Sequence, residues 1–339
     1  CRRLLTTEVT SMRGDSIKLA PESAPKNRFR DIDRLIASHQ YVLATDRLEA
    51  MLKSDWRDLD VLARLATVIA ATVKRPLDGV GKGDQNPKTY LGKWGIDDLH
   101  DPYAQYFIGK LYGEWALTQA VNTPVLDRLA HKYDPYANTH VANESVNAYL
   151  LALAGLDNYT VRFELGQMCH WYSTSCYPGY VNNTSYFWMS GAEHRKLQRH
   201  AEEHLKKAIE FDPTAAEAYA ELAELYVDIM DYSSANEALR AGMQAVGADT
   251  MAPDSESILA GALARVAMQE SQWEQALKYS LRCVELQPKE PLFRAYAGRC
   301  YIGLGEKCEA FDSLTRAKDL GLDLRFYLAM LDSLTRTLR

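Results

Sequence analysis

Two histidines and a glutamate stand at a spacing that can hold zinc. His200, Glu203 and His204 match the H-x-x-E-H pattern, in which histidines four residues apart share one face of a helix. The residues between them favour another interpretation, because Ala201 and Leu205 belong to an apolar stripe and no third ligand is indicated. We therefore expect a solvated helix face and predict neither a metal site nor a cofactor, with a zinc-dependent hydrolase as the last alternative.

Small residues recur at a fixed interval along the chain. Ala201 and Ala235 are 34 residues apart, and so are Ala276 and Ala310. Helical periodicity dominates around them, while the alternation typical of strands is scarce. Small side chains at regular positions let neighbouring helices cross closely. An interval of 34 residues is typical of tetratricopeptide (TPR) helix–turn–helix units.

On these residues the chain resembles the TPR family. The resemblance is clear over residues 191–321, partial over 25–73 and slight in between. It implies an all-α fold: a right-handed solenoid of helix pairs, interrupted by a helical and loop insertion. The predicted segments are a tether over 1–24, TPR-like helices over 25–74, the divergent insertion over 75–158, a TPR array over 159–321 and a capping helix over 322–339.

Within the insertion, the pattern predicts a loop over 77–100 and helices over 103–120, 124–133 and 144–156. The array that follows is expected to begin with a helix over 159–172 and a loop over 173–189.

The resemblance also implies a concave surface lined by the first helix of each pair, with positions 2, 5, 9, 12 and 13 exposed. Repeats that begin near Ala216, Ser257 and Pro291 then give a groove with acidic and basic ends, suited to a polar peptide or a partner helix. The alternative is an empty, solvated face. The predicted groove residues are Glu217, Glu224, Asp228, Arg265, Met268, Gln269, Leu292, Arg299 and Ile302.

The two helices of a TPR hairpin run antiparallel, so residues that face each other have positions in the repeat that add to a nearly constant number. By this rule four of the six cysteines can form two facing pairs, Cys300 with Cys308 and Cys169 with Cys176. The resemblance therefore implies two disulfides and an oxidising compartment. The alternative is that all of them are reduced core thiols.

An aromatic cluster stands between the two predicted helices of the repeat that begins at Tyr159. It can form a binding rim or interface, or it can fold back as a flap over the solenoid. The residues are Trp171, Tyr172, Tyr177, Tyr180, Tyr186, Phe187 and Trp188.

The first residue, Cys1, is followed by a polar segment with Pro21 and Pro25. This start resembles a processed bacterial lipoprotein, in which the first cysteine is acylated and a tether follows. We expect lipidation at Cys1 and a periplasmic or cell-surface location, with the outer membrane favoured because Arg2 is not an aspartate. An arbitrary chain boundary is the alternative.

Composition limits the kinds of partner that the chain is expected to bind. The formal net charge of −6 disfavours nucleic-acid binding, and no apolar stretch reaches the roughly 20 residues of a membrane span. Membrane contact is expected through the lipid anchor only. The sequence therefore predicts a non-enzymatic scaffold or assembly factor that binds a protein or peptide in an envelope complex; the alternative is a ligand-binding accessory protein of a transporter.

Overall fold

The computed structural model describes residues 28–73, 86–122, 135–175, 180–181, 184–185, 191–247, 252–322 and 325–338. In these ranges the chain is an all-α helical-repeat array of TPR type, with helix hairpins packed one against the next. The described part also holds a short antiparallel strand pair, β1 (Tyr180–Val181) and β2 (Thr184–Ser185). No helix of the described ranges has the length and apolarity needed to span a bilayer.

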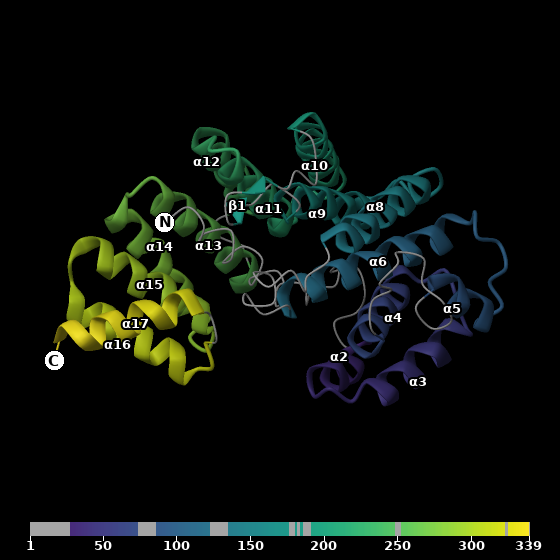
Figure 1. Cartoon of the computed structure of the whole chain (residues 1–339), viewed down its shortest axis with the longest axis horizontal. Coiled ribbons are helices and arrows are strands. Elements are labelled where there is room, and N and C mark those ends of the chain that lie inside the picture. The colour runs from purple at the N-terminus through teal and green to yellow at the C-terminus, as the bar shows by residue number, and fades with distance from the viewer. Residues whose placement is uncertain are drawn as a thin grey trace. The chain divides into compact units, whose positions relative to one another are not determined.

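One compact unit of the chain is Val9–Ala201. Its described helices are α2 (Arg30–Ala37), α3 (Tyr41–Leu52), α4 (Leu59–Thr72), α5 (Pro87–Lys93), α6 (Pro102–Asn122), α8 (Pro135–Ala152) and α9 (Tyr159–Ser175). Helix α4 packs between α3 and α6, and α6 and α8 form the most extensive pair (Figure 1). Trp115, Tyr106 and Phe107 of α6 are fully buried, so α6 is the centre of this unit's core.

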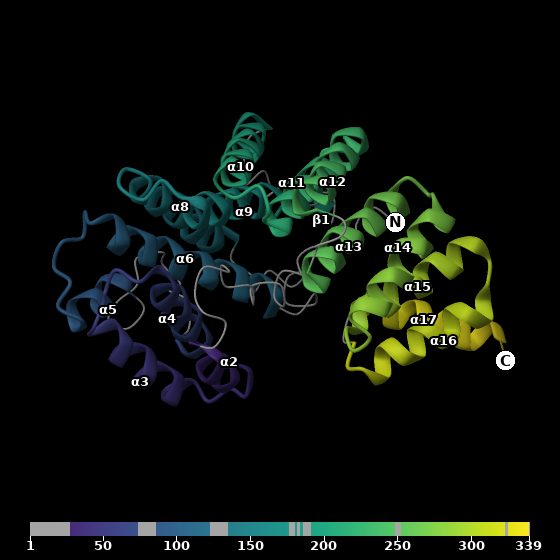
Figure 2. The ribbon, with the colours of Figure 1, turned by 180° about the vertical axis from the view of Figure 1, so that it is seen from behind.

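The other compact unit covers most of the remaining chain, Glu202–Arg339, so the division falls inside α10 (Gly191–Phe211). Its further helices are α11 (Ala216–Asp228), α12 (Tyr232–Val246), α13 (Pro253–Gln269), α14 (Trp273–Leu286), α15 (Pro291–Leu304), α16 (Lys307–Asp319) and α17 (Arg325–Leu338). The pairs α11/α12, α13/α14 and α15/α16 follow one another, and α17 packs on α16 (Figure 2).

Small residues stand where the helices cross most closely, as the 34-residue interval predicts. A Cβ added at Gly298 of α15 would lie 2.7 Å from Cγ of Leu314 in α16. A Cβ at Gly109 of α6 would lie 3.1 Å from Cγ of Tyr149 in α8. Ala201, Ala235, Ala276 and Ala310 are all fully buried.

The same turn joins the two helices of four hairpins. His39, Met230, Ser271 and Gly305 have left-handed backbones, with φ of 58°, 62°, 60° and 82°. The amide after each one donates to a carbonyl five residues earlier, for example Asp231 to Tyr226 (2.8 Å). This is the Schellman pattern, which satisfies carbonyls left open at the end of a helix. The four hairpins therefore share a turn geometry, although their helices range from 8 to 17 residues.

Three predicted boundaries differ from the structure. The expected loop over 77–100 contains α5, which begins with Asn86 as a side-chain cap and Pro87 in the first turn. The expected helix over 144–156 begins earlier, because α8 starts at Pro135. The expected loop over 173–189 contains the β1–β2 pair. The expected helix over 124–133 lies outside the described residues.

Candidate binding surface

The predicted groove of the C-terminal unit has a charged pair at its centre. Glu224 of α11 and Arg265 of α13 form an ion pair, and both side chains are partly buried. This pair joins two successive first helices, as expected if both face the same surface. The acidic and basic groups that sequence analysis placed at separate ends of the groove are thus in direct contact.

The other predicted groove residues differ in their exposure. Met268 is only 3% exposed, so the expectation that it lines an open groove is wrong. It lies near the end of α13, a helix with buried residues along most of its length. Asp228 is exposed, and the rest are partly exposed: Glu217, Gln269, Leu292, Arg299 and Ile302.

The predicted disulfides are not formed. Cys169, Cys283, Cys300 and Cys308 are all free thiols. Cys300 points toward α14, where its Sγ lies 3.8 Å from Oγ of Ser280, while Cys308 of α16 is exposed. The predicted pairing was wrong because the position in the repeat gives the level of each cysteine along the hairpin axis. It does not give the direction in which the side chain points.

Cys169 is buried in α9, and its expected partner Cys176 lies outside the described residues. The expected tether and lipidation site, with Cys1, also lie outside the described residues.

The aromatic loop is described only in part. Trp171 and Tyr172 belong to α9 and are buried, so these two are core residues and not loop residues. Tyr180 lies in β1, where the structure describes the backbone but not the side chain. The remaining predicted members, Tyr177, Tyr186, Phe187 and Trp188, lie outside the described residues.

The histidine pair of α10 does not present a common ligand set. His204 is buried, whereas Glu203 is exposed on another side of the helix. Among the described residues, no group of three histidine, cysteine or acidic side chains is arranged to hold a metal ion.

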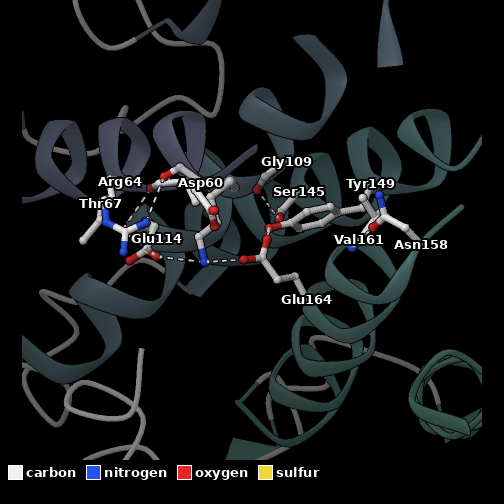
Figure 3. Close-up of polar contacts among 12 residues, drawn as sticks. Asp60, Arg64, Thr67, Gly109, Glu114, Ser145, Tyr149, Asn158, Val161 and Glu164 are labelled. Atoms are coloured by element: carbon white, nitrogen blue, oxygen red, sulfur yellow. Dashed lines mark hydrogen bonds and ion pairs between the residues drawn. The ribbon is translucent and has the colours of Figure 1, made fainter. Parts of the chain in front are cut away.

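A second charged site lies in the N-terminal unit, on α4, α6 and α9. We define the acidic cluster as Asp60, Glu114 and Glu164 with the ammonium of Lys110 between them (Figure 3). Nζ of Lys110 lies 3.3 Å from Oε1 of Glu114 and 3.0 Å from Oε1 of Glu164. The two carboxylates raise the pKa of Lys110 against the opposing effect of its burial. Lys110 is therefore a fixed cation at neutral pH.

Hydrogen bonds connect the cluster to the surrounding helices. Oγ1 of Thr67 in α4 donates to Oε1 of Glu114 (3.2 Å), and Oη of Tyr149 in α8 donates to Oε2 of Glu164 (2.9 Å). Glu114 is only 5% exposed. The polar contacts thus join the first helices α4, α6 and α9 and hold the carboxylates in fixed positions.

The sequence analysis missed the acidic cluster, although a signal for it was present. Counted from Leu59, Asp60 and Thr67 occupy positions 2 and 9 of a repeat, two of the positions that the TPR resemblance places in the groove. Ile108 and Gly109 set the register of α6, which puts Lys110 and Glu114 at positions 9 and 13. Applying the groove rule to α4 and α6 would have found Asp60, Lys110 and Glu114, three of the four members of the cluster.

Comparisons with known proteins give likeness of fold only. No family model matches the chain, and no curated protein matches it. Among solved structures, MamA is 20% identical over 58% of this chain and 95% of its own, with a TM-score of 0.37. YrrB, described as a TPR protein with an unusual peptide-binding site, is 13% identical over 72% of this chain and 96% of its own (TM-score 0.36). TTC0263, a thermophilic TPR protein of Thermus thermophilus, is 16% identical over 81% of this chain and 98% of its own (TM-score 0.38).

Proposed function

We propose that this chain is a non-enzymatic interaction scaffold, which holds a segment of a partner protein against the first helices of its repeats. The observation that supports this most is the kind of contact that joins successive first helices. In one unit Lys110 bridges to Glu164, and in the other Glu224 pairs with Arg265. The helix sides that face the second helices carry small and apolar residues instead.

Such an arrangement separates folding from recognition. Apolar burial between hairpins supplies the stability of the array, whereas the charged side chains on the first helices contribute less to it. Their value lies in recognition, because fixed and complementary charges select a partner and set its register. Within each unit, successive first helices offer such groups to an extended or helical segment.

The buried thiols are consistent with a binding role. Burial raises the pKa of Cys169 and Cys283 to about 12, which leaves little thiolate at neutral pH. Because the thiolate is the nucleophile, these two cysteines are not suited to covalent catalysis.

Site-specific photo-crosslinking tests the proposal. A photoreactive amino acid is placed at Gln269 in α13 or Gln167 in α9, and at the exposed Gln275 of the second helix α14 as control. We expect the first two positions to capture a common partner, identified by mass spectrometry, and Gln275 to capture none. Equal capture from all three, or capture from Gln275 alone, would contradict binding along the first helices.

The envelope location and the acylation of Cys1 stay predictions of the sequence. Membrane fractionation and the intact mass of the protein purified from its own cells test both of them directly.

A further inference from the structure

The acidic cluster of the N-terminal unit contains more negative than positive charge. Its three carboxylates, Asp60, Glu114 and Glu164, face one ammonium, and Lys110 is already shared between two of them. Two further cations act on Asp60, but each is paired with another carboxylate: Nε of Arg64 lies 2.9 Å from Oδ1 of Asp33, and Nη2 of Arg28 lies 2.6 Å from Oδ2 of Asp58. Nη1 of Arg64 donates to the backbone carbonyl oxygen of Asp60 (3.2 Å) and not to its carboxylate. The cluster therefore keeps a surplus of negative charge.

One carboxylate oxygen of the cluster lacks a donor. Oδ1 of Asp60 is buried and accepts no hydrogen bond among the described residues. Burial raises the pKa of Asp60, and the charges of Asp58 and Glu164 act in the same direction, against the opposing charges of Arg64 and Arg28. A carboxylate in this position gains stability from any cation that reaches it.

A fully buried tyrosine gives an independent sign of an unmet contact. Tyr106 of α6 is 0% exposed, and its Oη interacts with Glu164 but makes no hydrogen bond of normal geometry within the described part of the chain. Burial raises the pKa of the phenol most, and the interaction with Glu164 and the charges of Asp60 and Glu114 raise it further. A buried hydroxyl that lacks a well-formed hydrogen bond is costly, so this side of the cluster is only partly satisfied.

We propose that the acidic cluster binds an arginine side chain from a partner protein segment. This inference rests on the proposed function and names the chemistry of recognition in the N-terminal unit. A guanidinium offers five donors in a planar fork, which suits recognition of carboxylates such as those of Asp60 and Glu164. Arginine is also more weakly hydrated than lysine, so less hydration is lost when its charge enters a partly buried site.

The probe is an acetylated hexa-arginine peptide, with hexa-citrulline as its uncharged isostere. Binding to the full chain is measured by fluorescence anisotropy at low and at physiological salt. We expect the wild-type protein to bind the arginine peptide and not the citrulline peptide. Asp60→Asn and Glu164→Gln each remove one acceptor charge and should weaken binding about tenfold or more, the effect of losing a charged hydrogen bond.

A matched control separates the cluster from the general charge of the protein. Asp46→Asn makes the same change at an exposed residue of α3 and should leave the affinity unchanged. Lys110→Gln provides a test of opposite sign. It removes the competing cation, so the variant should bind the arginine peptide more tightly, although its melting temperature falls.

The outcomes are decisive in both directions. The inference would be overturned if Asp46→Asn weakened binding as much as Asp60→Asn, because nonspecific charge would then explain the data. It would also be overturned if Lys110→Gln weakened binding, because the cluster would then be purely structural. Circular dichroism checks that each variant is folded. If crosslinking from Gln269 and Gln167 captures a partner but the arginine peptide does not bind, only this inference fails. If the peptide binds as expected and no partner is captured, the proposed function fails instead.

Discussion

At the scale of single residues, burial decides which thiols can react. Burial raises the pKa of Cys169 and Cys283 to about 12 and that of Cys300 to about 11. Cys300 also contacts Ser280 inside the hairpin stack. Cys308 is exposed on α16. The four described thiols should therefore differ sharply in reactivity although all are reduced.

Alkylation at neutral pH, without reductant, should modify Cys308 in the native protein and leave Cys169, Cys283 and Cys300 untouched. All four should react after unfolding, because the thiols then regain their ordinary pKa and become accessible. Peptide mass spectrometry before and after denaturation reports the result. Failure of Cys300 and Cys308 to react in denaturant, until a reductant is added, would show the disulfide that the structure lacks.

Gly298 should resist even the smallest enlargement. Gly298→Ala places a methyl group 2.7 Å from Cγ of Leu314, which is itself buried and cannot turn aside. We expect a loss of about 1–3 kcal/mol in the free energy of unfolding from overpacking, which exceeds the gain in helix propensity of about 1 kcal/mol.

Gly92 of α5 is the matched control, since nothing lies within 4 Å of an added Cβ there. Gly92→Ala should be neutral or stabilising in the same denaturant titration. Equal stability of the two variants would mean that α15 and α16 do not cross as closely as described.

At the scale of elements, the repeated hairpin turn carries strain that the sequence has not removed. Met230 and Ser271 hold left-handed backbones of the kind that Gly305 adopts in the corresponding turn. A side chain in this conformation costs roughly 1–2 kcal/mol, which glycine avoids. Met230 is also 62% exposed, so its side chain contributes little packing.

We expect Met230→Gly to raise the free energy of unfolding by about 0.5–1 kcal/mol, and Ser271→Gly to act in the same direction. Gly305→Ala is the reverse change in an equivalent turn and should destabilise the protein by a similar amount. Thermal melts followed by circular dichroism measure all three. A lower melting temperature for both glycine variants would show that these turns do not need a left-handed residue.

The elements that sequence analysis predicted well are those fixed by local patterns. The interval between Ala276 and Ala310 placed the hairpins of the C-terminal unit, because small residues at helix crossings leave a periodic trace. Helix α5 was missed although Asn86 and Pro87 form a recognisable start, because the surrounding glycines and polar residues favoured a loop.

The candidate sites were harder to predict, since they depend on side-chain direction. The register rule brought Glu224 and Arg265 to one surface but did not show that they pair. The same kind of rule failed for Cys300, which points at α14 and not at α16. Tyr106 and Asp60 lie 46 residues apart in the sequence, and only the folded structure brings them close enough to interact.

At the scale of the whole molecule, the chain divides into two compact units inside α10. In a repeat array each hairpin is stabilised mainly by its immediate neighbours. The C-terminal unit contains three complete hairpins and the terminal helix α17, which is enough repeats for a stable array.

A fragment spanning residues 191–339, which retains all of α10, should therefore fold without the rest of the chain. We expect a helical circular-dichroism spectrum and a cooperative melt, measured side by side with the full-length protein. A fragment that begins at residue 216 lacks α10 and is the control, in which α11 loses its contact from Tyr226 to Glu202 and should be less stable. A disordered 191–339 fragment would show that the unit needs the other for its stability.

The exposed thiol of α16 has a practical consequence. Cys308 stands on the second helix α16, whereas Glu224 and Arg265 belong to first helices, and the other described thiols are buried. A chain with Cys1 and Cys176 replaced by serine would accept a maleimide dye at that one position. The label would then serve as an optical reporter for partner docking and could immobilise the scaffold with its recognition helices unmodified.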